Sequence, residues 1–228
     1  SQMKNKVLVI GADHHNTLGI VESLGQKGLN SYVLIVGENI NSFVLKSRYV
    51  IEGWVCSSPE QVVDEMLKHF SDTKNKVIVY SSYDNVSSVL DSSVQRLSPF
   101  FILPVTNMPG SLERKMSKEY MSDLAREVGL DVPRTWMVSD RKVPADIEFP
   151  CITKAISSVE GSKKNIKICK KREELEEFLA NSEHCPIIQI QKFIIKDFEF
   201  QFLGCSMDNG KHIIISGRTH IDRPNGID

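Results

Sequence analysis

A chain of 228 residues is long enough for one large domain or two smaller ones, each with a core of its own. Its apolar fraction of 41% and charged fraction of 25% are ordinary for a globular protein. Because the formal net charge is only -1, composition gives no electrostatic support for a general role in binding nucleic acid or a membrane surface.

The first half of the sequence alternates short apolar runs with amphipathic segments. Residues 7–10 form a continuous apolar run that ends at Gly11, which is typical of a strand buried on both faces. Further strands are expected at residues 32–36, 76–80 and 100–104, and helices at residues 17–27, 59–70 and 85–97. Because strands and helices alternate, we predict an α/β domain with an open parallel sheet and right-handed crossovers.

The second half has a different pattern, and Met108-Pro-Gly110 marks the expected boundary. A single helix is expected at residues 113–128, with Gly129 as its stop. Strands expected at residues 151–154, 166–169 and 187–190, with a helix at residues 172–180, predict a small α+β lobe.

Two final segments, residues 198–203 and 212–216, alternate polar and apolar side chains. They predict half-buried antiparallel strands joined by a turn at residues 207–210. The predicted organisation is therefore a Rossmann-like domain at residues 1–112, a linker helix and α+β lobe at residues 113–190, and the start of an antiparallel lobe at residues 191–228.

The five cysteines are scattered, odd in number and contain no C-x-x-C pair, so they indicate neither a zinc site nor a disulfide framework. We expect reduced thiols packed as small hydrophobic residues. No signal peptide precedes the first predicted strand, and no apolar run reaches the length of a membrane span. The sequence therefore predicts a cytoplasmic protein.

The loop after the first predicted strand, residues 11–19, opens a helix, so its amides could hold an anion. It lacks G-x-G-x-x-G, and no acidic residue ends the second strand, which disfavours a dinucleotide site. His14 and His15 suggest a metal, but without a third ligand nearby we favour solvated loop histidines. Asp84 stands where open α/β sheets bind ligands, and a carboxylate at a helix N-terminus explains it equally well.

Lys154 ends a predicted strand and precedes a loop of small residues that leads into the next strand. Such a loop can fold over a triphosphate, with a strand lysine beneath it facing the same oxygens. Taken alone, the composition favours a mobile hairpin with solvated lysines. The segment is not a P-loop, because G-x-x-x-x-G-K-[ST] is absent.

The order of several short motifs along the sequence favours the phosphate-binding loop over the mobile hairpin. Lys118 lies on the predicted linker helix, and Phe149-Pro-Cys-Ile-Thr-Lys154 follows with its loop. The Arg172-Glu-Glu-Leu helix, the run Ile188-Gln-Ile-Gln-Lys-Phe-Ile194 and Glu199 come next. This succession resembles the ATP-grasp superfamily, the fold of biotin carboxylase, carbamoyl-phosphate synthase and D-alanine ligase, over nearly the whole chain.

The amino-terminal part adds to the resemblance. Residues 7–37, followed by Ser47-Arg-Tyr49, are similar to the domain that precedes ATP-grasp in carbamoyl-phosphate-synthase-like carboxylate–amine ligases, including D-aspartate-ligase-like proteins. The resemblance implies a pre-ATP-grasp open parallel sheet, then the α+β lid lobe and the antiparallel carboxyl-terminal lobe of ATP-grasp.

The resemblance also implies an ATP site. Lys118 would contact the α-phosphate side and Lys154 the α- and β-phosphates. The loop over the β- and γ-phosphates would consist of Ser157, Ser158, Gly161 and Ser162.

At the other end of the nucleotide, Ile166 would lie against the adenine ring. The backbone of a hinge would read the adenine edge, with Gln191 standing where a Glu is usual; the hinge is Gln191, Lys192, Phe193 and Ile194. Glu199 would bind the ribose hydroxyls, with Asp197 as its rival. Arg218 or Arg223 would face the acyl-phosphate or the substrate carboxylate.

Magnesium is implied by the same resemblance, held by carboxylates and an Asn on later strands. Their motif has no counterpart in this sequence, so we expect the metal ligands beyond residue 228. For the same reason we expect this chain by itself to lack ligase turnover.

The predicted function of the intact protein is therefore ATP-dependent activation of a carboxylate as an acyl-phosphate, followed by attack of an amine. Candidates for the substrate end are Asp13, His14, His15 and Asp84. The expected partners are small-molecule carboxylate and amine substrates, without nucleic acid or membrane, and assembly into a homo-oligomer is left open. Two alternatives remain: a nucleotide-binding module without catalysis, and a Rossmann-like dinucleotide or sugar-nucleotide protein.

Overall fold

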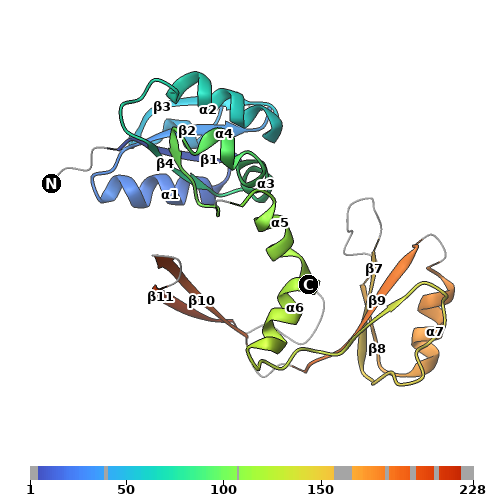
Figure 1. The fold of residues 1–228 in the computed structure, drawn as a ribbon. Helices are drawn as coiled ribbons and strands as arrows, with labels where there is room; N and C mark the ends of the chain where they lie inside the picture. Colours follow the sequence, from blue (N-terminus) through green and yellow to red (C-terminus); the bar gives the residue numbers. More distant parts are fainter. Residues whose placement is uncertain are drawn as a thin grey trace. The chain divides into compact units, whose positions relative to one another are not determined.

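The computed structural model describes residues 5–38, 41–106, 108–156, 166–182, 185–195, 199–207 and 211–221. The chain forms two compact units, a first unit of residues 1–129 and a second unit of residues 130–228 (Figure 1). The domain boundaries expected at residues 112 and 190 stay predictions.

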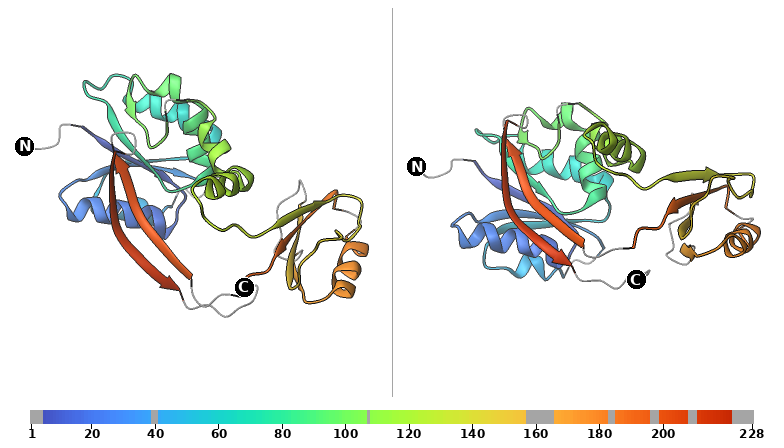
Figure 2. Two further views of the ribbon diagram at one scale, coloured as in Figure 1. Left: turned by 60° about the horizontal axis from the view of Figure 1, so that its bottom comes forward. Right: turned by 90° about the horizontal axis from the view of Figure 1, so that it is seen from below.

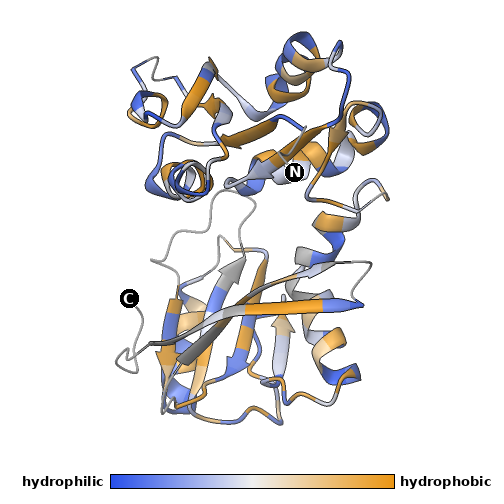
Figure 3. Ribbon diagram, turned by 90° about the vertical axis from the view of Figure 1, so that its left-hand side faces the viewer, coloured by the Kyte–Doolittle hydropathy of each residue, from blue (hydrophilic) through white to orange (hydrophobic). Residues whose placement is uncertain are grey.

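The first unit is built on the predicted parallel sheet, whose strand order is β3-β2-β1-β4-β5. The strands are β1 (Val7–Gly11), β2 (Ser31–Val36), β3 (Val50–Cys56), β4 (Val77–Ser81) and β5 (Phe101–Ile102). Strand β3 was not predicted from the sequence. The strands are mostly hydrophobic along their length, whereas the helices are of mixed character (Figure 3).

Helices cover both faces of this sheet, as an open α/β architecture requires. On one face α1 (His15–Gln26) packs Val21 against Val9, Val33 and Ile35. On the other lie α2 (Val62–Phe70), α3 (Asp84–Ser92) and α4 (Val94–Leu97). Short 3-10 helices at Val44–Lys46 and Pro59–Gln61 complete the connections.

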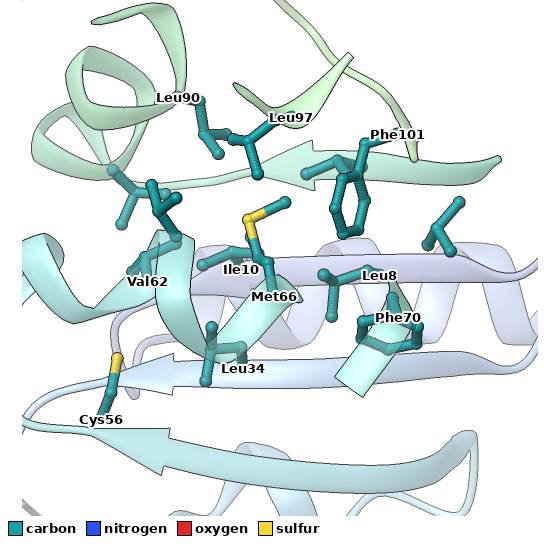
Figure 4. Close-up of a cluster of buried hydrophobic side chains, with 14 of the residues drawn as sticks. Leu8, Ile10, Leu34, Cys56, Val62, Met66, Phe70, Leu90, Leu97 and Phe101 are labelled. Atoms are coloured by element: carbon teal, nitrogen blue, oxygen red, sulfur yellow. The ribbon is translucent and has the colours of Figure 1, made fainter. Parts of the chain in front are cut away.

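The core under α2 follows from helical spacing. Its buried residues are Val62, Val63, Met66 and Phe70, which recur on one face of the helix. Figure 4 shows Met66 close to Ile10, with Leu90 and Leu97 above it, and Phe70 next to Leu8. This apolar contact fixes the strands whose carboxyl ends carry the predicted substrate-end residues.

The linker helix differs from the prediction. Instead of one helix, the structure has α5 (Ser111–Met116) and α6 (Lys118–Glu127), separated by Ser117 in an extended conformation (φ -65°, ψ 135°). The Ser117 hydroxyl oxygen accepts a hydrogen bond from the Tyr120 amide at 3.1 Å. A serine that caps the following helix competes with continuous helix, and this explains the break. Gly129, at φ 81°, ends α6 as expected.

The second unit contains a four-stranded antiparallel sheet of order β6-β9-β7-β8. Its strands are β6 (Thr135–Val138), β7 (Cys151–Ile156), β8 (Ile166–Cys169) and β9 (Ile187–Lys192). Helix α7 (Arg172–Ala180) lies along one face, where Leu175 and Leu179 are fully buried (Figure 2). The predicted α+β lobe is confirmed, with β6 as an unpredicted edge strand.

The antiparallel pair is also confirmed. Strands β10 (Glu199–Met207) and β11 (His212–Ile221) form a two-stranded sheet with an irregularity between Leu203 and Gly204. Figure 2 shows the pair as a long ribbon. Most of the predicted turn, residues 208–210, lies outside the described residues. Within the described part of the chain, every helix falls short of the length and apolar character that crossing a membrane requires.

The segment Ser47-Arg48-Tyr49 contacts α1 through a hydrogen bond and an aromatic ring. The Ser47 hydroxyl donates to Glu22 of α1 at 2.6 Å, and the Tyr49 ring lies against Gly25 of the same helix. A Cβ at Gly25 would stand 2.1 Å from the Tyr49 ring, whereas a Cβ at Gly19 would meet nothing within 4 Å. Gly25 is therefore required by packing and Gly19 is not.

We predict that Gly25→Ala destabilises the first unit by about 1–3 kcal/mol, because the Tyr49 ring must move. Gly19→Ala, on the same helix, should stabilise it by about 0.5–1 kcal/mol through helix propensity. Trp54 lies in β3 and Trp136 in the second unit, so urea unfolding followed by fluorescence in a Trp136→Phe background reports the first unit alone. Equal effects of the two substitutions would contradict the packing argument.

Cysteine reactivity gives a second prediction. Cys151 and Cys169 face each other across β7 and β8 and are fully buried, whereas Cys205 is exposed. Burial raises the pKa of the Cys151 thiol from 9.0 to about 12, and burial likewise raises the pKa of Cys169. Since a thiolate is the reactive form, Cys151 stays unreactive at pH 9 as well as at pH 8, and the raised pKa and burial of Cys169 also lower its reactivity.

In a short pulse of iodoacetamide, we expect alkylation of Cys205 and protection of Cys151 and Cys169, read by peptide mass spectrometry. Urea-unfolded protein, in which all five cysteines should react, is the control. Rapid labelling of Cys151 in the folded protein at pH 8 would show that the sheet core opens readily.

Candidate functional site

The two faces of the four-stranded sheet differ in what they carry. Cys151, Thr153 and Ile190 are buried on the α7 side. Side chains alternate along a strand, and directly paired residues share a face. The residues that alternate with Cys151, Thr153 and Ile190, and the residues paired with them, therefore point to the opposite side. We call these residues the distal face: Thr135, Met137, Ile152, Lys154, Ile166, Ile168, Gln189 and Gln191.

Lys154 lies at the middle of the distal face. It pairs with Ile166 of β8 on one side and Gln189 of β9 on the other, and it is half-buried. Among the described residues it has no ion-pair partner, whereas Lys167 on the α7 side pairs with Glu177 at 3.2 Å. A half-buried lysine beside isoleucines and without a carboxylate partner in the described chain is suited to an anionic ligand.

The end of β9 and the segment that follows it are anchored through the backbone. The Lys192 amide donates to the Arg134 carbonyl and the Phe193 amide to the Pro150 carbonyl, both at 2.9 Å. The Lys192 side chain pairs with Glu148 at 2.5 Å, and this hydrogen bond lowers the pKa of the Glu148 carboxyl. Ile194 is 54% exposed, and its amide has no acceptor within the described residues. That amide can donate to a ligand.

The structure thus brings Lys154, Ile166 and Gln191 together on one face. The other predicted ATP contacts lie elsewhere in the chain. Lys118 opens α6 in the first unit, Glu199 opens β10 opposite Ile221, and Arg218 lies in β11 opposite Phe202. Predicted residues outside the described part of the chain are Ser157, Ser158, Gly161, Ser162, Asp197 and Arg223.

The substrate-end candidates lie at the carboxyl edge of the parallel sheet, between β1 and β4. Asp13 is tied to the following chain: its carboxylate accepts from the Ser42 hydroxyl at 2.5 Å and from the Val44 amide at 3.3 Å. His14 caps α1 by accepting from the Asn16 amide at 3.3 Å, and the exposed His15 ring lies 3.8 Å from that of His14. Asp84 is exposed in the first turn of α3.

The hydroxyl groups of Thr17 and Ser82 fill the space above Gly11. Thr17 donates its hydroxyl proton to the Ala12 carbonyl at 2.7 Å, so the Ser82 hydroxyl, also 2.7 Å away, donates to Thr17. A Cβ at Gly11 would stand 2.0 Å from the Ser82 oxygen and 2.4 Å from that of Thr17. The glycine after β1 therefore makes room for the protein's own side chains, whereas in a dinucleotide fingerprint it makes room for pyrophosphate.

Two further observations concern ligands. Among the described residues, no group of three or more His, Cys, Asp or Glu side chains is arranged to hold a metal ion. A pocket of about 350 Å³ lies around α5, and the sequence had not indicated it. Its lining includes Arg114, Lys115 and Tyr120, with the Arg114 guanidinium 5.5 Å above the Tyr120 ring. Its two cations would suit an anionic group.

No protein-family model matches the sequence, and a comparison with curated proteins finds no match either. Solved structures do match. L-amino acid ligase from Bacillus licheniformis is similar over 99% of this chain and 53% of its own, at 15% identity and a TM-score of 0.68. Phosphoribosylglycinamide synthetase from Anaerococcus prevotii is similar over 93% of this chain and 51% of its own, at 15% identity and a TM-score of 0.62.

A third match is N5-carboxyaminoimidazole synthase from Aspergillus clavatus, solved in complex with ADP and 5-aminoimidazole ribonucleotide. It covers 98% of this chain and 55% of its own, at 12% identity and a TM-score of 0.63. The chain has the ATP-grasp fold. It spans about half the length of these ATP-grasp structures.

Each sheet of the chain corresponds to one part of this fold. The five-stranded parallel sheet is the domain that precedes ATP-grasp, and the four-stranded sheet with α7 is the ATP-grasp lid lobe. Strands β10 and β11 belong to the antiparallel lobe. The distal face with Lys154 is thus a face of the lid lobe.

The hydrogen bonds of Asp13 predict a structural role. Asp13→Ala leaves the Ser42 hydroxyl, on a buried side chain, and the Val44 amide without their acceptor, and it should destabilise the first unit by about 1–3 kcal/mol. Asp84→Ala is the matched control: it removes only an exposed acid from the first turn of α3, at about 0.3–1 kcal/mol. Urea midpoints of the two variants in the Trp136→Phe background test this, and an Asp13→Ala midpoint equal to wild type would contradict it.

Proposed function

We propose that this chain binds ATP on the distal face of the lid lobe, as part of a ligase that joins a carboxylate to an amine. The fold supports a ligase of the ATP-grasp type, and solved structures of that fold contain ADP. The observation that carries the proposal is the position of Lys154: a half-buried cation without an ion-pair partner in the described chain, between Ile166 and Gln189.

The distal face offers both kinds of surface that a nucleotide requires. Ile152, Ile166 and Ile168 are half-buried isoleucines on which a flat base can lie. Lys154 supplies a compact charge for phosphate oxygens, and the Ile194 amide a donor for the edge of the base. Such a site binds chiefly through apolar contact with the base and charge neutralisation at the phosphates.

The remaining roles implied by the resemblance are part of the proposal. Lys118 contacts the α-phosphate side, and the loop over the β- and γ-phosphates consists of Ser157, Ser158, Gly161 and Ser162. Glu199, or Asp197 in its place, binds the ribose hydroxyls. Arg218 or Arg223 faces the acyl-phosphate or the substrate carboxylate, and the candidates for the substrate end are Asp13, His14, His15 and Asp84.

In the proposed reaction, a carboxylate oxygen of the substrate attacks the γ-phosphorus, and the bond from that phosphorus to the β-γ bridging oxygen breaks to release ADP. An amine nitrogen then attacks the acyl carbon, loses a proton and expels inorganic phosphate. The protein's contribution is positioning and charge neutralisation, without a covalent step on a side chain. Magnesium belongs to the expected chemistry, but the described residues do not include a group suited to hold it, so no step is assigned to it.

Two alternatives stay open. A nucleotide-binding module without catalysis would use the same distal face. A Rossmann-like dinucleotide or sugar-nucleotide protein would use the β1–β4 edge, and the hydroxyls above Gly11 disfavour it. A cytoplasmic location and small-molecule carboxylate and amine partners remain part of the proposal, and the oligomeric state stays open.

We predict that Lys154→Ala weakens ATP binding about 10- to 100-fold, the effect of losing a charge-assisted hydrogen bond. Lys167→Ala is the matched control, because Lys167 lies one strand away on the α7 side and pairs with Glu177; its affinity for ATP should be that of wild type. Titration calorimetry of wild type and the two variants, with ATP and with NAD, measures these affinities. Equal losses in the two variants, or a wild type that binds NAD and not ATP, would refute the site.

A further inference from the structure

A short chain of hydrogen bonds joins β6 to β9 on the distal face. Thr135, at the start of β6, lies directly opposite Gln191 of β9. The Gln191 amide nitrogen Nε2 donates to the Thr135 hydroxyl oxygen at 3.1 Å. That hydroxyl in turn donates to the carbonyl of Pro133 at 3.2 Å. All three groups belong to the second unit and are half-buried.

The direction of this chain is set by proton count. A backbone carbonyl can only accept, so the single hydroxyl proton of Thr135 goes to Pro133. The Thr135 oxygen can then only accept, and it requires the NH2 end of the Gln191 amide. A glutamine without such a neighbour can present either end, because its oxygen and nitrogen have the same shape. Here the amide is fixed, and its oxygen Oε1 is the end left for a ligand.

We propose that Thr135 is a positioning residue: it holds Gln191 so that Oε1 accepts a hydrogen bond from the exocyclic amino group of the bound base. This rests on the proposed ATP site. Adenine carries an amino group at C6, whereas hypoxanthine and guanine carry a carbonyl oxygen there. An oriented Oε1 attracts the amino group of adenine and repels the carbonyl oxygen of the other two bases. Thr135 therefore sets the choice of base through Gln191.

The residue type at position 191 makes this orientation necessary. A carboxylate has two acceptor oxygens and needs no partner to select between them, whereas a glutamine presents a donor when it flips. Thr135 therefore matters because residue 191 is Gln, and it would cease to matter if residue 191 were Glu. This dependence of one residue on the other is a signature that a merely structural contact would not produce.

The test compares ATP with inosine triphosphate, which replaces the C6 amino group by a carbonyl. Calorimetry should give wild type a preference for ATP of about 10-fold, the size of one well-placed hydrogen bond. Thr135→Val removes the hydroxyl at constant shape, frees the amide to turn and should lower the preference to about 2-fold. Thr135→Ser restores a hydroxyl and should keep the wild-type preference.

The decisive comparison uses Gln191→Glu alone and with Thr135→Val. Both should prefer ATP to the same extent, because a carboxylate needs no orientation. An unchanged preference in Thr135→Val, or equal weakening of both nucleotides in it, overturns the role of Thr135 while leaving the ATP site in place. A wild type that binds neither nucleotide overturns the proposed function, and this inference with it.

Discussion

The strand register of the lid-lobe sheet is the constraint on which the candidate site depends. Side chains alternate with a period of two, so a slip of β7 by one residue would turn Lys154 toward α7 and expose Cys151 on the other side. Burial opposes that slip, because Cys151 and Thr153 are fully enclosed on the α7 side. The Thr153 hydroxyl also donates to the Lys167 carbonyl at 3.1 Å. The core beneath α7 thus decides which residues lie on the distal face.

Patterns of apolar residues predicted most of the fold. The buried strands β1, β2 and β4 have continuous apolar runs, and α2 and α7 have clear helical stripes. Strand β3 was missed because it lies at the edge of the sheet, where Glu52 and Gly53 interrupt the apolar pattern. The helix break at Ser117 was missed because the stripe continues across it, and only the cap distinguishes two helices from one.

The candidate site was predictable to the extent that it follows from strand alternation. Lys154, Ile166 and Gln191 could be placed on neighbouring strands from the sequence, and pairing brings them to one face. The role of Asp13 could not be predicted, because its hydrogen-bond partners Ser42 and Val44 lie about 30 residues away, before and at the start of a short 3-10 helix. The same holds for Thr135, whose partner Gln191 is 56 residues away and on a different strand. Long-range pairs of polar groups leave no periodic signal.

The carboxyl edge of the parallel sheet and the distal face of the lid lobe differ in how well each suits a phosphate. In a dinucleotide-binding sheet, glycines after the first strand let backbone amides approach the phosphates. Here the Thr17 and Ser82 hydroxyls occupy the space above Gly11. That edge is therefore poorly suited to a pyrophosphate, although its strand order is that of a nucleotide-binding sheet. The cation of Lys154, on a different sheet, is the better candidate for an anion site, and this distinction rests on individual side chains rather than on the parallel sheet.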